Sequence, residues 1–82
     1  MAITDALTGA ANRRYFEIRL PEELERAARY GFDLSCVMVD IDHFKSINDT
    51  YGHATGDIVI REVAAVLKGA MRSIDFVARY GG

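Results

Sequence analysis

The chain has 82 residues, 50% of them hydrophobic and 27% charged, with a formal net charge of -2. This length allows one small domain with a thin core, and the charge balance excludes a basic surface for duplex DNA or an anionic membrane. The single cysteine, Cys36, rules out an intramolecular disulfide, and its apolar neighbours predict a buried structural thiol. No apolar stretch is long enough to span a bilayer and no signal peptide precedes Asp5, so we expect a cytoplasmic location.

Hydrophobic spacing predicts the order helix, strand, helix, strand. The expected elements are an N-terminal turn over residues 1–11, a helix over 12–30, a strand over 34–40, a helix over 57–72 and a strand over 76–80. Asn12 is expected to cap the start of the first helix, and Gly31 its end. Pro21 lies inside the helical pattern, and because proline removes a backbone hydrogen bond, we expect the helix to be kinked or broken there.

The most informative stretch is 39–49, where an apolar run ends in two carboxylates, Asp40 and Asp42. Side chains alternate along an extended segment, so these two acids should point in opposite directions. An acid directly after a hydrophobic run needs a partner or a cation, and Mg²⁺ accepts carboxylate and carbonyl oxygens. We therefore interpret Asp40 as a metal ligand, and Asp42 as an acid that caps the following helical turn.

The residues after Asp42 present groups that suit a phosphate. The backbone amides of Asp42, His43 and Phe44 open a helical turn, where free N–H groups can grip an anion. Lys45 adds a positive charge, although a lone lysine is more often a solvated surface residue. His43 and His53 lack a third ligand at the usual spacing, which favours roles other than zinc binding for both.

Two pairs of polar residues leave more than one interpretation open. Asn48 and Asp57 offer the donor and acceptors that suit a guanine edge, but a loop-stabilising amide and a helix N-cap explain them equally well. Arg72 can complement the end of the second long helix and Asp75 can terminate it. Alternatively, the guanidinium of Arg72 offers a fork for a phosphate or a guanine.

Four spaced motifs resemble the N-terminal half of a GGDEF domain, the catalytic module of diguanylate cyclases. They are Asp5-Ala-Leu-Thr-Gly-Ala-Ala-Asn-Arg-Arg14, Asp40-Ile-Asp-His-Phe-Lys-Ser-Ile-Asn-Asp-Thr-Tyr-Gly-His53, Gly56-Asp57 and Arg79-Tyr-Gly-Gly82. Ala10 departs from the leucine common in the first motif, which should affect only packing. The resemblance implies an α+β fold, an incomplete ferredoxin-like or nucleotidyl-cyclase palm that lacks the C-terminal half of its sheet.

The resemblance also implies a reaction and a set of site residues. Family members condense two GTP molecules into cyclic di-GMP as homodimers, with Mg²⁺ or Mn²⁺ as cofactor. Asp40 matches the catalytic metal-binding aspartate, and the carbonyl of Ile41 a further ligand. The remaining matches are His43, Phe44 and Lys45 for the phosphates, Asn48 and Asp57 for guanine, Arg72 and Asp75 for product at an inhibitory site, and Gly81 and Gly82 for the start of the signature.

The GGDEF signature begins with two glycines, which Gly81 and Gly82 match, and its acidic residues would follow Gly82. The resemblance therefore implies two consequences. The 82-residue chain alone should be inactive, and a degenerate receptor that binds GTP or cyclic di-GMP without catalysis is the alternative to a cyclase. The family's third strand lies between the first two, so segments 34–40 and 76–80 must either pair directly or leave open edges. Open edges favour self-association by strand exchange.

Overall fold

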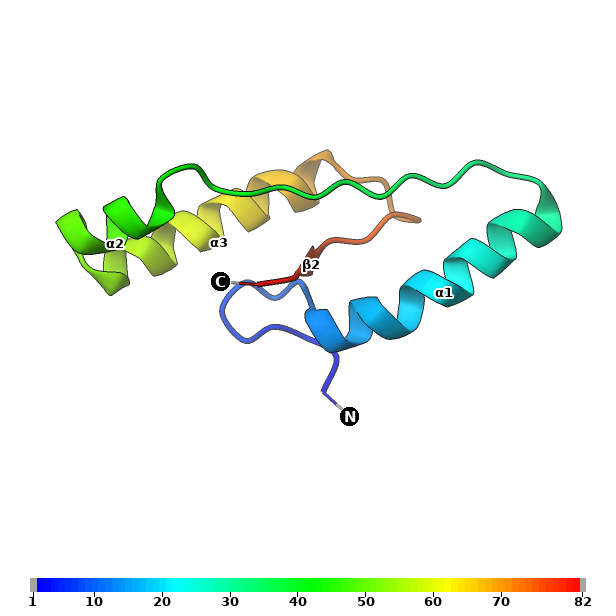
Figure 1. Ribbon diagram of the computed structural model, residues 1–82, viewed down its shortest axis with the longest axis horizontal. Coiled ribbons are helices and arrows are strands. Elements are labelled where there is room, and N and C mark those ends of the chain that lie inside the picture. Colours follow the sequence, from blue (N-terminus) through cyan, green and yellow to red (C-terminus); the bar gives the residue numbers. More distant parts are fainter. Residues whose placement is uncertain (1, 82) are drawn as a thin grey trace.

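The computed structural model describes residues 2–81, which form an α+β fold of three helices and a two-stranded sheet. In chain order the elements are β1 (Ala11–Asn12), α1 (Arg13–Tyr30), α2 (Phe44–Tyr51), α3 (His53–Ala70) and β2 (Ala78–Arg79). Figure 1 shows α1 and α3 as two long helices, with β2 between them. No helix within residues 2–81 is long and apolar enough to cross a membrane.

The two ends of α1 are capped as the sequence predicts. The Asn12 side chain accepts a hydrogen bond from the Tyr15 amide at 2.8 Å. Gly31 ends the helix with φ 71°, a left-handed conformation that glycine adopts without a steric penalty, and its amide donates to the Ala27 carbonyl. α1 nevertheless runs through Pro21 without a break, so the broken helix is wrong. The ion pair between Arg19 and Glu23, at 2.6 Å, spans the proline and supports this turn.

The sheet is shorter than the sequence predicts. β1 and β2 are parallel, with Ala11 opposite Ala78 and Asn12 opposite Arg79. The strand expected over 76–80 is limited to Ala78–Arg79, and directly before it the Val77 carbonyl accepts a hydrogen bond from the Ala11 amide at 3.0 Å.

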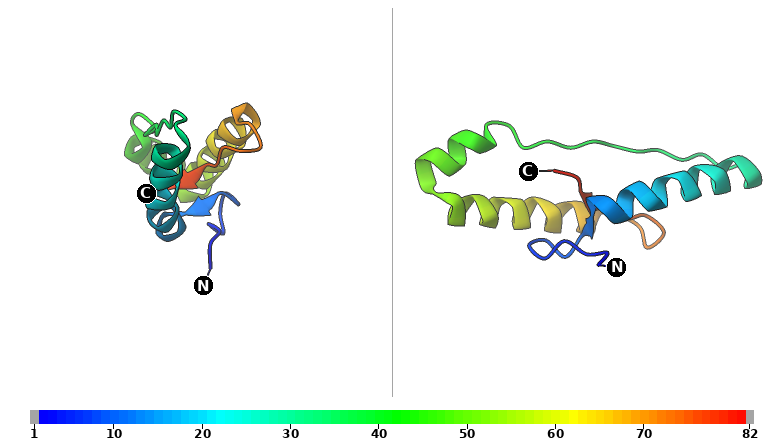
Figure 2. Two further views of the ribbon diagram at one scale, coloured as in Figure 1. Left: turned by 90° about the vertical axis from the view of Figure 1, so that its right-hand side faces the viewer. Right: turned by 60° about the horizontal axis from the view of Figure 1, so that its bottom comes forward.

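The strand expected over 34–40 is also absent. This segment joins no sheet and forms an extended connection from the end of α1 to α2 (Figures 1 and 2). A strand needs a hydrogen-bonded neighbour. The sequence predicts that segments 34–40 and 76–80 either pair with each other or leave open edges, and the structure shows open edges. Cys36 is exposed for the same reason, so the expected buried thiol is wrong.

α3 begins at His53 rather than at 57 and ends at Ala70. Asp57 therefore lies inside the helix, and its alternative role as an N-cap is wrong. One side of the helix is an apolar stripe: Ile60, Val63 and Leu67 line a cavity next to β2, and Ala64 is buried beside them.

The interior of the described chain is small. The buried hydrophobic residues are Ala10, Ala27 and Ala64, and no large side chain is fully buried. The radius of gyration is 14.7 Å, against about 12 Å for a compact chain of this length. A groove of about 520 Å³ separates segment 34–39 from the residues around β2. The predicted thin core is therefore confirmed, and the fold is open along this groove.

Aromatic contacts fasten the C-terminal segment to α1. The Phe16 ring lies 5.6 Å from the Tyr80 ring, edge to face, and 6.3 Å from the Phe76 ring. The guanidinium of Arg13 lies 4.2 Å from the centre of the Tyr80 ring. Such pairs contribute beyond simple burial. They hold the chain in place directly before Gly81.

Candidate nucleotide and metal site

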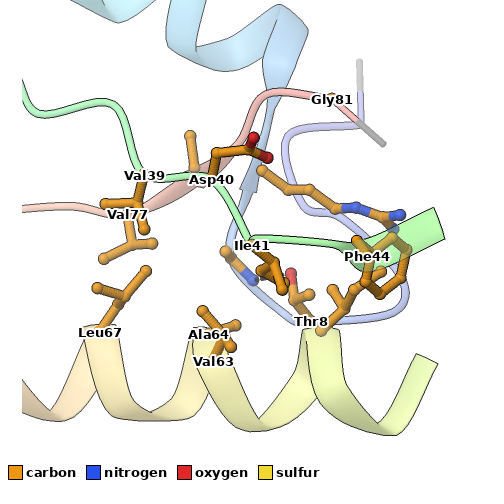
Figure 3. A pocket seen from close by; sticks show the side chains of 14 residues that line it. Thr8, Val39, Asp40, Ile41, Phe44, Val63, Ala64, Leu67, Val77 and Gly81 are labelled. Atoms are coloured by element: carbon orange, nitrogen blue, oxygen red, sulfur yellow. Dashed lines mark hydrogen bonds between the residues drawn. The ribbon is translucent and has the colours of Figure 1, made fainter. Parts of the chain in front are cut away.

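Asp40 lies at the mouth of a cavity of about 170 Å³ between the extended segment, β2 and α3 (Figure 3). α3 forms the floor through Val63, Ala64 and Leu67. In Figure 3 the Asp40 carboxylate points away from this floor, on the side where Gly81 lies. The apolar run that precedes Asp40 thus places an acid beside this cavity, on the side of the first glycine of the Gly-Gly pair.

An ion pair connects the N-terminal turn to the residues before Gly81. Asp5 Oδ1 lies 3.4 Å from Arg79 Nη1, although the two residues are 74 positions apart. Asp5 Oδ2 accepts hydrogen bonds from the Thr8 amide at 3.0 Å and from the Thr8 hydroxyl at 2.8 Å. Lys68 of α3 donates to the Thr8 carbonyl at 2.9 Å. The turn therefore holds Arg79 and α3 together beside the cavity.

These contacts change the acidity of Asp5. Burial favours the neutral carboxyl, but the hydrogen bonds from Thr8 and the positive charge of Arg79 outweigh it, and the pKa of Asp5 is lowered. The contact between Asp5 and Thr8 has a sequence signal, because an Asp followed three residues later by Ser or Thr is typical of a turn closed by side-chain hydrogen bonds. The partnership with Arg79 has no local signal, and sequence reasoning missed it.

The lowered pKa of Asp5 predicts a pH dependence of stability. A carboxylate whose folded pKa lies below its unfolded value of 3.8 stabilises the fold above that pH, and the contribution is lost as the pH falls through the folded pKa. We expect Asp5→Asn to reduce the free energy of unfolding at pH 7 by about 1.5–3 kcal/mol, the range for hydrogen bonds to charged groups. Circular dichroism at 222 nm during urea unfolding, repeated from pH 7 to pH 3, measures this difference.

The difference between Asp5→Asn and the unmodified chain should shrink toward acid pH, because both then carry a neutral group at position 5. Asp33→Asn is the matched control, since Asp33 is exposed in the loop after α1. A difference that stays constant from pH 7 to pH 3 would contradict an electrostatic role for Asp5.

The turn before α2 differs in one respect from the prediction. Asp42 does not cap the helix: the N-cap is His43, whose side chain makes no capping hydrogen bond. His43 has φ 57°, an uncommon left-handed conformation outside glycine, and the helix begins at Phe44. The first backbone N–H groups of α2 lack partners within the helix, as at any helix start. The Lys45 ammonium forms an exposed ion pair with Asp49 at 3.0 Å.

Asn48 and Asp57 are brought close through the contact of α2 with α3. Asn48 packs against Gly56, the residue before Asp57, and Asp57 is exposed on α3. Asn48 Oδ1 is buried and has no hydrogen-bond partner among the described residues. A buried amide oxygen without a partner costs free energy. The positions of Asn48 and Asp57 in the fold are thus compatible with the prediction that both contact one guanine.

Arg72 and Asp75 form one closed turn after α3. The Arg72 amide donates to Asp75 Oδ2 at 3.0 Å, and Arg72 Nε lies 3.4 Å from the same oxygen. The Asp75 amide in turn donates to the Arg72 carbonyl. The Arg72 side chain is 78% exposed, so most of its guanidinium remains available to a ligand. α3 ends at Ala70, before Arg72.

A family model described as diguanylate cyclase, GGDEF domain, matches residues 2–82. The chain belongs to the GGDEF family. Among curated relatives, diguanylate cyclase DgcP of Pseudomonas aeruginosa is 48% identical over 81 residues, which are 99% of this chain and 12% of that protein. Response regulator PleD of Caulobacter vibrioides is 49% identical over 82 residues, which are 100% of this chain and 18% of that protein. The GGDEF chain therefore spans only a small part of these relatives.

Solved GGDEF structures match the same fold. The GGDEF domain of DgcB from Caulobacter crescentus in complex with c-di-GMP superposes with a TM-score of 0.86 at 43% identity, and the match covers 100% of this chain and 47% of that one. A sensory box/GGDEF family protein from the same organism gives a TM-score of 0.93 at 40% identity, over 99% of this chain and 52% of that one. The incomplete nucleotidyl-cyclase palm expected from the sequence is confirmed.

The donor set of this GGDEF chain fits a divalent cation only in part. Within residues 2–81 no three His, Cys, Asp or Glu side chains gather closely enough to hold a metal ion. Asp40 and Ile41 both line the cavity. Mg²⁺ is commonly held by one or two carboxylates together with substrate phosphates and water, and Asp40 is the one carboxylate among the described residues that line this cavity. Gly82 lies outside the described residues.

Proposed function

We propose that the protein carrying this chain is a diguanylate cyclase that condenses two GTP molecules into cyclic di-GMP. The observation that carries the proposal is the position of Asp40, an exposed acid at the end of an apolar segment, facing the side of Gly81 in a GGDEF fold (Figure 3). The names of relatives such as diguanylate cyclase DgcP support the same activity. Two copies of the domain, each holding one GTP, would form the catalytic unit.

The chain's own residues would bind the metal ion, the phosphates and the guanine. The Asp40 carboxylate and the Ile41 carbonyl hold a Mg²⁺ or Mn²⁺ ion, which neutralises phosphate charge when bound. The backbone N–H groups of His43 and Phe44 grip the phosphates, and Lys45 adds positive charge at the rim. Asn48 and Asp57 read the guanine edge by hydrogen bonding.

The reaction itself is two equivalent phosphoryl transfers. The 3′-hydroxyl oxygen of one GTP forms a bond to the α-phosphorus of the other and loses its proton. The bond from that phosphorus to the bridging oxygen of the β-phosphate breaks, and pyrophosphate leaves. The second transfer closes the ring. Positioning and charge neutralisation dominate such chemistry, so the single carboxylate of Asp40 should not suffice, and we expect the 82-residue chain alone to be inactive.

A second function is favoured by the turn at Arg72 and Asp75. This turn is fully formed, and its exposed guanidinium can bind a guanine or phosphate without any catalytic group. We propose that it binds cyclic di-GMP as an inhibitory site in a cyclase. In a degenerate receptor the same turn, together with a GTP-binding surface, would provide the whole function.

The test is the product formed from GTP. With Mg²⁺ present, a longer protein that carries this chain should produce cyclic di-GMP and pyrophosphate, separable by ion-exchange chromatography, while the 82-residue chain should produce none. Binding of GTP without turnover by the longer protein would refute the cyclase and support the receptor. Cyclic di-GMP made by the pure 82-residue chain would overturn the expectation that it is inactive.

A further inference from the structure

Asn48 lies directly on the backbone of a helical glycine. α2 and α3 form a helical hairpin joined at Gly52 (Figure 1). In this hairpin the Asn48 side chain fills the space where a side chain at Gly56 would stand. A Cβ atom built on Gly56 would overlap Asn48 Oδ1 and lie 2.9 Å from Asn48 Cγ and 3.2 Å from Phe44 Cζ. The separation from Asn48 Cγ is shorter than packed carbon atoms tolerate, whereas the separation from Phe44 Cζ is only tight.

Gly56 is not required by the backbone. It lies inside α3 and is buried, and its φ is not positive. Glycine is a poor helix former, so its place here needs a packing reason. α3 contains a natural comparison: a Cβ built on Gly69, near the other end of the helix, meets nothing within 4 Å. The two glycines differ in what lies over them, not in their secondary structure.

We propose that Gly56 is the positioning residue of Asn48. The missing Cβ lets the Asn48 amide lie against α3 with its oxygen covered, at Gly56, the residue directly before Asp57. A methyl group at position 56 turns the amide away from α3 and separates it from Asp57. The inference rests on the proposed function only in assigning base recognition to Asn48 and Asp57; the geometry of the contact is independent of it.

The experiment compares Gly56→Ala with Gly69→Ala in the same chain. Alanine favours the helix at both positions, so Gly69→Ala should raise the melting temperature by about 4 °C or more. Gly56→Ala should lower the melting temperature and shift the side-chain amide signals of Asn48 in a nitrogen–proton NMR spectrum. The Asn48 signals are identified by their loss in Asn48→Ala. Gly69→Ala should leave those signals unmoved.

A double substitution separates Asn48 from the other neighbour of Gly56. In the Asn48→Ala background the space is empty, so adding Gly56→Ala should no longer destabilise the fold and should raise the melting temperature as at position 69. Equal destabilisation in both backgrounds would assign the contact to Phe44 and overturn the proposal. A stabilising Gly56→Ala with unmoved Asn48 signals would overturn it as well.

Nucleotide preference links the contact to function. In the longer protein that carries this chain, Gly56→Ala should reduce the ratio of GTP to ATP affinity at least about fivefold, while Gly69→Ala should not change it. If the unmodified protein binds no GTP, the proposed function fails, and the melting and NMR results still decide the role of Gly56. If it prefers GTP and Gly56→Ala leaves that preference intact, positioning fails and the proposed function stands.

Discussion

Replacing Asp40 with asparagine should lower the rate of cyclic di-GMP formation by about a thousandfold in a longer protein that carries this chain. Asparagine keeps the size of the side chain but removes the charge, and the loss of one charge that stabilises phosphoryl transfer costs about 4 kcal/mol, or about a thousandfold in rate. Asp40 is the only acidic residue among the described residues that line this cavity, so no other carboxylate there can substitute for it. Initial rates of product formation over a range of Mg²⁺ concentrations measure the effect.

Asp42→Asn is the matched control for this experiment. Asp42 is exposed, lies two positions after Asp40 and makes no capping hydrogen bond to α2. Its substitution should change the rate by less than about threefold, since exposed charges without close partners contribute little. A rate for Asp40→Asn above a tenth of the unmodified rate would refute the metal-binding role of Asp40.

The 82-residue chain should associate with itself in solution through segment 34–39. This segment exposes 78% of Val37, 67% of Met38 and 55% of Val39. None of its backbone groups pairs with another strand within residues 2–81. Exposed apolar residues on an unpaired extended segment are a template for pairing with a second chain. Sedimentation velocity at several concentrations should therefore show dimers or larger species by strand exchange.

Val37→Lys should shift this equilibrium toward the monomer, with the dissociation constant raised at least about tenfold. The lysine costs little where Val37 is exposed in the single chain, but pairing would bury its charge. Val66→Lys is the matched control, because Val66 is 70% exposed on the outer side of α3 and outside both cavities. A compact, stable monomer of the unmodified chain would contradict self-association.

The helix α1 shows how far local sequence signals reach. Asn12 and Gly31 cap its ends as predicted, because a cap depends on the residue itself and on its neighbours within one turn. Pro21 does not break the helix, since packing and the surrounding ion pairs outweigh one lost hydrogen bond. The apolar stripe of α3 was also predictable from spacing, but its first turn, from His53 onward, was not.

The segment before Asp40 shows where local signals fail. Residues 34–40 have the composition of a buried strand, but a strand exists only with a hydrogen-bonded partner, and this chain places none beside it. Cys36 is exposed for that reason, although its neighbours are apolar. The strand prediction fails because it depends on tertiary structure. A sequence pattern shows which conformation a segment favours, but not which segment lies next to it.

The sequence by itself determined the family, the α+β class and the order of the candidate site residues, because these depend on motifs and spacing within short stretches. Only the tertiary structure decided that Asp5 holds Arg79, that Asn48 rests on Gly56, and that Asp40 stands over a cavity on the side of Gly81. The physical reason is distance along the chain. Contacts between residues as far apart as 5 and 79 follow from how the helices and strands pack, and no local pattern encodes them.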